Sequence, residues 1–381
     1  MPFWQREVVR DSVSMTFAQT YELDLPKTGQ LGSLLLYVRS TQNAAPFLTA
    51  VKWRLIDYIS KVEVIGNGSE VIKSFDGRQA LASAFYDDGR VPSGIWRHYS
   101  NTPHRQVIPI NFGRWIRDQI YGLDLSKWDQ VTLKVTNDAT ATEFTTDITV
   151  TVEAEWMREG GAFSGYMREE EWKVWAPAAG VTEYSDLPTG RPIRRILLRA
   201  RPGVDTADAL NNSSMDRVMG DIDFSFNTGQ VRVYKGSMEE LRYMLAAEGG
   251  IDVETEGMID RTSDYGFETG VGYVLTGQKA VASYTAAPAT FPATIGVPDV
   301  QDSSQQSQQR VADAPLEWHV RGHGFMHNLP IWEAKDPTLA DMLDPDGRKV
   351  VKLDIQCQSG TTVSGTHHAA ESAIVLSRLV A

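Results

Sequence analysis

Apolar and polar residues alternate in many short stretches of the chain, and two of these stretches recur 160 positions apart. Val62-Glu63-Val64 matches Ile222-Asp223-Phe224, and both have the period of two that is typical of a half-buried strand. Asn67-Gly68 follows the first stretch, and Asn227-Thr228-Gly229 follows the second; both are turn sequences that tolerate positive φ. The pattern predicts the same strand–turn–strand unit twice.

A short helix is predicted after each of these units. Ser237 and Glu240 have the spacing of a capping box, and Asp76 and Gln79 occupy the matching positions of the first copy. A glycine that can end a helix follows in each copy, at Gly89 and Gly249. The predicted inward-facing positions are Leu81, Ala84 and Phe85 in the first copy and Leu241, Met244 and Leu245 in the second.

Further matches extend the repeat to most of the chain. The turn Asp24-Leu25-Pro26 recurs as Asp186-Leu187-Pro188, and Ile108-Pro109-Ile110 recurs as Leu329-Pro330-Ile331. Alternating strands follow at 131–135 and 351–355, and each copy ends with a strand, at 148–152 and 374–376. The sequence therefore predicts an all-β protein of two tandem eight-stranded antiparallel jelly rolls, each with a short helix. The expected limits are an N-terminal arm at 1–19, a first roll at 20–158, a connector at 159–181 and a second roll at 182–381.

The two copies differ by one long insertion. The distance from Gly89 to Pro109 is 20 residues, whereas the distance from Gly249 to Pro330 is 81. Much of the added segment, at about 250–328, has low complexity, as in Ser303-Ser304-Gln305-Gln306. A long insertion in one loop of a compact sandwich usually projects from the surface and is often functional.

Composition and charge narrow the possible functions. Of 381 residues, 42% are hydrophobic and 23% are charged, which excludes wholesale disorder. The net charge of −12 argues against a protein that coats DNA, which needs Lys and Arg to displace counterions. Cys357 is the single cysteine, so no internal disulfide is possible and a reducing compartment is expected. The first residues have no signal-peptide pattern, and no apolar run approaches the ~20 residues that span a bilayer.

The search for catalytic motifs finds no nucleophile elbow, phosphate-binding loop or dinucleotide fingerprint, so no catalytic residue and no cofactor is predicted. Histidine provides the only metal candidates, His319, His323 and His327, at four-residue spacing. On a helix this spacing allows a shared ion, but Gly322 and Gly324 disfavour a helix. On a strand the spacing places successive side chains about 13 Å apart. The favoured interpretation is that these are structural histidines, with no metal.

Three other groups of residues were weighed. Glu169, Glu170 and Glu171 could supply an acid–base pair, but a solvated charge run is the favoured interpretation. Trp172 and Trp175 could stack on a sugar, although packing of the connector is favoured. The N-terminal arm is amphipathic, and it could contact a membrane or a neighbouring subunit, or simply fray; the residues predicted to make such a contact are Phe3, Trp4, Arg6 and Arg10.

Two tandem jelly rolls with a helix in each and a large loop on one resemble the double jelly-roll major capsid proteins of tailless icosahedral double-stranded DNA viruses. That lineage includes adenovirus hexon and the coat proteins of membrane-containing phages. The first-roll resemblance lies in Asp24–Gly29 with Leu34–Val38, Ile59–Ser69, Phe112-Gly113-Arg114 and Gly122–Leu125.

The resemblance implies a homotrimer that forms a pseudo-hexameric capsomer in the virion shell, after synthesis in the host cytoplasm. It also implies contacts with neighbouring capsomers, penton and minor capsid proteins, and an internal lipid membrane. The insertion would form a tower and the arm would lie at the capsid base. Neither enzymatic turnover nor sequence-specific nucleic-acid binding is implied. The alternatives are a two-jelly-roll glycan-acting hydrolase similar to peptide N-glycosidases, and a receptor-binding protein of a virion.

Overall fold

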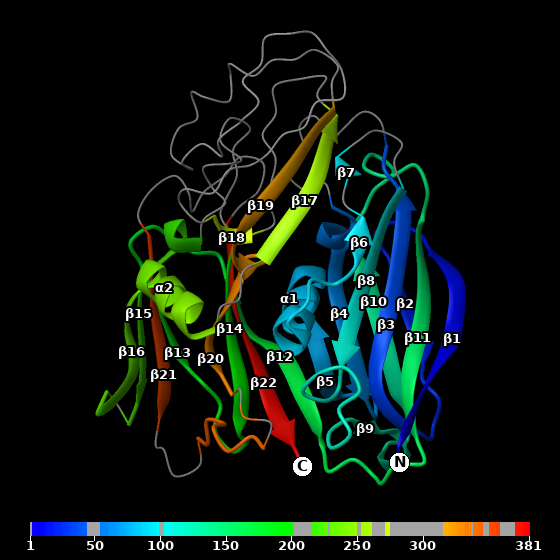
Figure 1. Cartoon of the computed structure of the whole chain (residues 1–381), viewed down its shortest axis with the longest axis horizontal. Coiled ribbons are helices and arrows are strands. Elements are labelled where there is room, and N and C mark those ends of the chain that lie inside the picture. Colours follow the sequence, from blue (N-terminus) through cyan, green and yellow to red (C-terminus); the bar gives the residue numbers. More distant parts are fainter. Residues whose placement is uncertain are drawn as a thin grey trace. The chain divides into compact units, whose positions relative to one another are not determined.

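The computed structural model describes residues 2–43, 54–95, 97–98, 103–201, 215–227, 229–249, 253–260, 271–274, 315–334, 336, 338–345, 350–358 and 370–381 (Figure 1). The chain forms two compact units. The first comprises Met1–Pro46, Lys52–Glu171 and Val375–Ala381, and the second comprises Phe47–Val51 and Trp172–Ile374. The chain enters the second unit within one strand, β12 (Tyr166–Trp175), and returns within the last strand, β22 (Glu371–Val380).

The first jelly roll has eight long strands, four in the order β1-β11-β3-β8 and four in the order β2-β10-β4-β5. The second run continues through β12, which pairs parallel with β5 at Glu169 and Glu170. These strands are β1 (Phe3–Met15), β2 (Thr20–Asp24), β3 (Gln30–Thr41), β4 (Ile59–Gly66), β5 (Glu70–Phe75), β8 (Pro103–Asn111), β10 (Val131–Asn137) and β11 (Ile148–Arg158). Shorter elements of the first unit are η2 (Leu55–Tyr58), α1 (Gly77–Asp88), β6 (Gly94–Ile95), β7 (Arg97–His98), β9 (Leu123–Asp124) and η3 (Leu125–Lys127).

The second jelly roll repeats this topology. Its sheets have the orders β12-β22-β14-β20 and β13-β21-β15-β16. Besides β12 and β22, the strands are β13 (Thr182–Asp186), β14 (Ile193–Arg201), β15 (Met219–Phe226), β16 (Val231–Ser237), β20 (Asn328–Glu333) and β21 (Val351–Cys357), with η4 (Met215–Arg217) and α2 (Met238–Gly249) between them. Counted along each roll, both have the orders 1-8-3-6 and 2-7-4-5. The predicted fold class is confirmed.

The alternating residues of the sequence form the two cores. In the first roll Leu34, Leu36 and Val38 of β3 are fully buried and face the interior with Val64 of β4 and Leu133 of β10. In the second roll Leu198 of β14, Phe224 of β15 and Leu353 of β21 are equally buried. Burial of each such side chain contributes roughly 1.5–3 kcal/mol, so the cores dominate the stability of both units.

Turns and helix ends also follow the sequence. Asn67 and Gly68 have φ of 49° and 73°, and Asn227 and Gly229 have 51° and 85°, as hairpin turns require. Asp76 and Gln79 form a capping box on α1, and Ser237 and Glu240 do so on α2. The predicted inward stripe of α1 is buried. In α2 the expectation for Met244 was wrong, because this side chain is 48% exposed.

The N-terminal segment and the connector each contain the first strand of a roll. We expected an arm at 1–19, and Phe3–Met15 form β1, which pairs antiparallel with β11 along its length. We expected a connector at 159–181, and it contains β12 and leads into β13. Of the 250–328 insertion, the structure describes the backbone of β17 (Val253–Asp260), β18 (Val271–Val274) and β19 (Pro315–Phe325), in the sheet order β18-β19-β17, and the turn that follows β19. The rest of the insertion lies outside the described residues.

Candidate functional site

The N-terminal strand β1 is an edge strand that is attached to the first roll by its backbone and by specific side chains. Its register with β11 pairs Phe3 with Arg158 and Arg6 with Glu155, and register shifts occur on both sides of Arg10. Such irregularities blunt an edge strand against uncontrolled pairing. Phe3 is 51% exposed, whereas Trp4 packs against Gly32 so closely that a Cβ there would lie 2.4 Å from the indole. The structure thus leaves Phe3 available for a partner and uses Trp4 internally.

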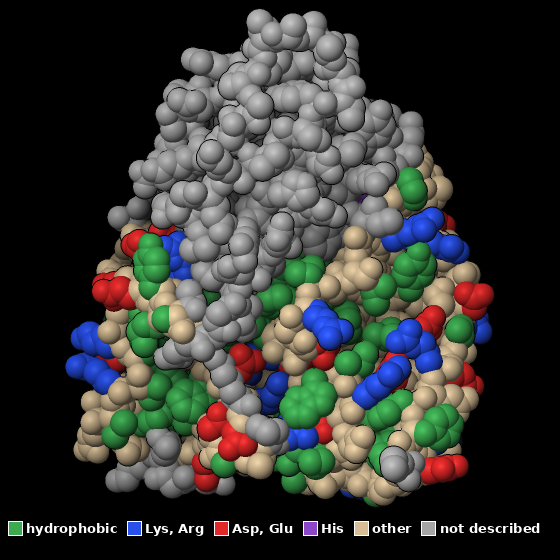
Figure 2. Space-filling view, in the orientation of Figure 1, with side chains coloured by type: hydrophobic (Ala, Val, Ile, Leu, Met, Phe, Trp, Pro, Cys, Tyr) green, Lys and Arg blue, Asp and Glu red, His purple; other side chains and the backbone are tan. Residues whose placement is uncertain are grey.

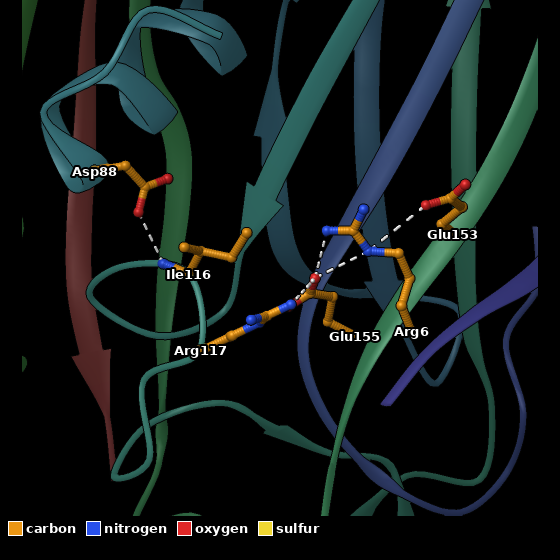
Figure 3. Close-up of polar contacts among 6 residues, drawn as sticks. All are labelled: Arg6, Asp88, Ile116, Arg117, Glu153 and Glu155. Atoms are coloured by element: carbon orange, nitrogen blue, oxygen red, sulfur yellow. Dashed lines mark hydrogen bonds and ion pairs between the residues drawn. The ribbon is translucent and has the colours of Figure 1, made fainter. Parts of the chain in front are cut away.

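Glu155 of β11 holds two arginines from different elements (Figure 3). Arg6 of β1 donates to Glu155 Oε1 at 2.6 Å, and Arg117, from the loop after β8, donates to Oε2 at 2.8 Å. The glutamate side chain is fully buried, while the two arginine side chains are each about half exposed. Burial alone would raise the pKa of Glu155, but the hydrogen bonds and charges of Arg117 and Arg6 outweigh it and lower the pKa below its ordinary value. Glu155 is therefore an ionised attachment point for β1.

The loop that carries Arg117 is fixed at both ends. Asp88, at the end of α1, accepts a hydrogen bond from the Ile116 amide at 2.9 Å (Figure 3). Arg114 and Asp118 are both buried and form two side-chain hydrogen bonds, of 2.6 and 2.8 Å. Arg117 itself has φ of 62°. These contacts fix the conformation of the loop, so that the Arg117 guanidinium is held in position to donate to Glu155.

Arg10, the fourth predicted contact residue, forms no part of this cluster. It pairs with Val152 in the register of β1 with β11, and its charge acts on Tyr21 of β2. Burial raises the pKa of Tyr21, and Arg10 acts in the opposite direction. The structure therefore does not bring the four predicted residues into one patch.

The acidic run at 169–171 is not the solvated surface that we expected. Glu169 is 3% exposed and accepts hydrogen bonds from buried Lys73 and from Ser83, each at 2.8 Å. Glu170 pairs with Arg378 and Arg168. Glu171 accepts from Gln79 at 2.6 Å and pairs with Lys61 at 3.2 Å. These acids attach the first half of β12 to β5, α1 and β4 of the same compact unit, so the solvated interpretation was wrong.

The tryptophans and histidines have separate locations. Trp172 is 41% exposed and Trp175 is half-buried, both on β12. His319 and His323 lie in β19, where the structure describes their backbone but not their side chains. His327 is buried in the turn that follows, with φ of 60°. Among the described side chains, no group of three His, Cys, Asp or Glu residues is placed to hold a metal ion. The possibility of a histidine metal site stays untested.

No helix in the described part of the chain has the length and apolar character needed to cross a membrane.

The comparisons with known proteins identify the fold. No protein-family model matches the chain, and no curated protein sequence matches it. Solved structures match over nearly its whole length. The STIV MCP has 10% identity and a TM-score of 0.53, covering 99% of this chain and 96% of the other. A chain of the Sulfolobus Turreted Icosahedral Virus atomic structure has 9% identity and a TM-score of 0.54, covering 98% and 90%. The major capsid protein P2 from Bacteriophage PM2 has 9% identity and a TM-score of 0.52, covering 100% and 98%.

The chain thus has the double jelly-roll fold seen in viral major capsid proteins, as the resemblance in its sequence predicted.

Proposed function

We propose that the protein is the major capsid protein of an icosahedral double-stranded DNA virus. The observation that carries this proposal is the repeated strand order of two complete eight-stranded rolls in one chain. Two equivalent rolls suit a subunit that tiles a closed surface, because a ring of three copies then has six similar jelly rolls around one axis. The likeness to solved capsid proteins over nearly the whole chain supports the same function.

In this function the protein acts by assembly, as a homotrimeric capsomer located in the virion shell after synthesis in the host cytoplasm. Neighbouring capsomers, penton and minor capsid proteins are its proposed partners, with an internal lipid membrane beneath the shell. Phe3, at the exposed start of β1, is the residue of the N-terminal group proposed for a base contact, because it is an exposed apolar side chain, whereas Trp4 packs against Gly32 and Arg6 binds Glu155. The insertion at 250–328 is the proposed tower.

The glycan-hydrolase alternative requires a pair of carboxylates that are free to exchange protons. The acids we considered for that role, Glu169 and its neighbours, are occupied by lysine, arginine and serine partners. These acids therefore give no support to the hydrolase alternative, and the proposed function is assembly.

The deciding measurement is the mass of the purified protein by light scattering on a sizing column. We expect a stable trimer of three 42.3 kDa chains, and hexagonal particles in electron micrographs of the same fraction. A monodisperse monomer at every concentration would contradict the proposal and would make glycan-release assays the next step.

A further inference from the structure

Part of the outer face of the first sheet, along the β3–β8 ladder, is apolar. In an antiparallel sheet with one face on the core, the outward positions are normally polar. On the β3–β8 ladder, however, the outward pairs are Leu35 with Pro109 and Tyr37 with Val107. Tyr37, Val107 and Pro109 are half-buried rather than covered. Figure 2 shows hydrophobic side chains among Lys and Arg side chains over these strands.

The next outward pair along the same ladder is a pair of like charges. Arg39 lies directly opposite Arg105, and both are exposed. Arg39 donates to Ser12 Oγ at 3.3 Å, and neither arginine forms an ion pair with a described residue. Like charges directly opposite each other on a sheet are destabilising. The isolated roll therefore bears a cost that an acidic partner would remove.

The outer face of the β13-β21-β15-β16 sheet in the second roll has the opposite arrangement. Asp223 of β15 lies directly opposite Asp354 of β21, and Oδ1 of each is buried without a hydrogen-bond partner. Arg232 and Lys235 approach only Oδ2 of Asp223, at 3.5 and 3.8 Å. Burial, then the charges of Asp223 and Asp186, raise the pKa of Asp354, although Lys352 acts against them.

An exposed aromatic residue, Tyr184, lies beside the acidic pair. The arginine pair of the first roll likewise has apolar neighbours, Tyr37 and Val107. Tyr184 of β13 is opposite Asp354 in the sheet and is 68% exposed. Each roll thus has an outer sheet face with a like-charge pair next to apolar surface, and the two pairs have opposite signs. Complementary charge of this kind selects a partner and fixes its register.

We propose that these two faces bind each other between copies of the chain: the β1-β11-β3-β8 face of one copy receives the β13-β21-β15-β16 face of a second copy, with Arg39 and Arg105 against Asp223 and Asp354. This inference rests on the proposed function and names the surface through which the capsomer forms. The two surfaces are different, so the contact is heterologous, and a rotation of one third of a turn between successive copies closes it into a ring of three.

The first test removes the charges while preserving shape. One variant carries Arg39→Gln with Arg105→Gln, and a second carries Asp223→Asn with Asp354→Asn. Each variant relieves a like-charge pair in its own roll, so the dilute, unassembled chain should unfold at a higher temperature than the wild type. Each also removes the charge–charge attraction between the two faces, so sedimentation equilibrium should show association at least about tenfold weaker. A merely structural role would not move the two readouts in opposite directions.

The matched control is Lys27→Gln with Lys127→Gln, which removes two exposed cations of the first unit that lie outside the four strands of this face, after β2 and at the end of η3. It should leave association unchanged. Wild-type-like association of both test variants would overturn the inference while leaving the capsomer proposal standing, whereas a wild type that never associates would overturn both. Dissociation of the wild type by EDTA would instead assign the acidic pair to a cation and would also overturn the inference.

The second test exchanges the charges. A chain with Arg39→Glu, Arg105→Glu, Asp223→Lys and Asp354→Lys should regain most of the wild-type association, because each intermolecular pair regains its opposite charge. Asp223→Lys places a cation beside Arg232 and Lys235, so this variant should unfold at a lower temperature than the wild type. A chain with only the two arginine reversals should stay monomeric. A four-site variant that folds, by circular dichroism, but remains monomeric would contradict the proposed pairing.

Discussion

Glu155 illustrates how a residue at an outward strand position becomes a buried structural charge. It lies on the outer face of β11, yet Arg6 and Arg117 cover it completely. Truncating a carboxylate that accepts several charge-assisted hydrogen bonds costs more than losing an exposed pair, because the remaining partners are left unmatched. The cluster therefore joins β1, β11 and the loop after β8.

Glu155→Gln should lower the free energy of unfolding by about 1–3 kcal/mol at pH 7, measured by urea denaturation. The pKa of Glu155 is lowered in the folded chain, so its contribution is present above the ordinary glutamate pKa and is lost as pH falls through the folded value. The difference between wild type and variant should consequently shrink in acid.

Glu153→Gln is the matched control, because Glu153 lies on the same strand and approaches Arg6 only at 3.8 Å with its side chain 31% exposed. Its effect should be within about 0.5 kcal/mol. Equal effects of the two substitutions, or a Glu155→Gln penalty that does not shrink as the pH falls below the ordinary glutamate pKa, would contradict this account.

The sequence did not reveal this cluster or the two charged pairs on the sheet faces. Arg6 was a candidate for a different reason, and Arg117, Glu155, Arg39 and Arg105 had no local signal. Strand alternation indicates which residues face outward, but only the register between strands places Arg39 opposite Arg105. Register depends on bulges and loop lengths that are specified by the whole fold.

At the scale of elements, β12 depends on a buried ion pair for its attachment to β5 and α1. Lys73 of β5 is fully buried and Glu169 of β12 nearly so, and Ser83 of α1 binds the same carboxylate. Breaking one partner of such a pair leaves an uncompensated buried charge, which costs more than replacing both partners with apolar residues.

Lys73→Met should therefore destabilise the chain by about 3–5 kcal/mol, and Lys73→Met with Glu169→Leu should be less damaging than Lys73→Met alone. Urea denaturation of the two variants and the wild type tests this order. Lys134→Met, which breaks the exposed pair with Glu22, is the control and should change the stability far less than Lys73→Met does, because solvent screens an exposed ion pair. A double variant that is less stable than Lys73→Met would show that the pair is worth more than an apolar contact.

The sequence predicted the central strands and both helices but not the first strand of either roll. Strands with one face in the core show regular alternation, as in Val131–Asn137, and the helices carry capping boxes. β1 is an irregular edge strand with most of its residues exposed, and β12 contains three consecutive glutamates. Their burial comes from tertiary partners, so their sequences resemble an arm and a charged linker.

At the scale of the whole chain, the internal repeat predicted the architecture correctly because each copy must fold the same strands in the same order. The offset between copies located the hairpins and helices of both rolls. It could not show how the compact units divide, because that division falls inside β12 and β22. The sequence also did not reveal the proposed assembly surfaces. Each surface combines residues from several strands, and only the register between the strands brings those residues together.

The exposed start of β1 provides a test of capsid-level function that is separate from capsomer formation. Deleting residues 1–12 would remove most of an edge strand and would confuse folding with assembly. Phe3→Asp changes one half-exposed side chain at the end of that strand, so the fold and the trimer should persist in thermal melts and light scattering.

Shell assembly, counted as closed particles in electron micrographs, should instead fall at least about tenfold, because an aspartate at a desolvated contact costs at least 1.4 kcal/mol. Val91→Asp is the control, since Val91 is also an exposed apolar residue of the first unit, at 38%, but lies outside β1. If Phe3→Asp assembles as well as Val91→Asp, the start of β1 makes no base contact. If Phe3→Asp abolishes the trimer, the residue belongs to the interface between copies of the chain, and the base contact must lie elsewhere.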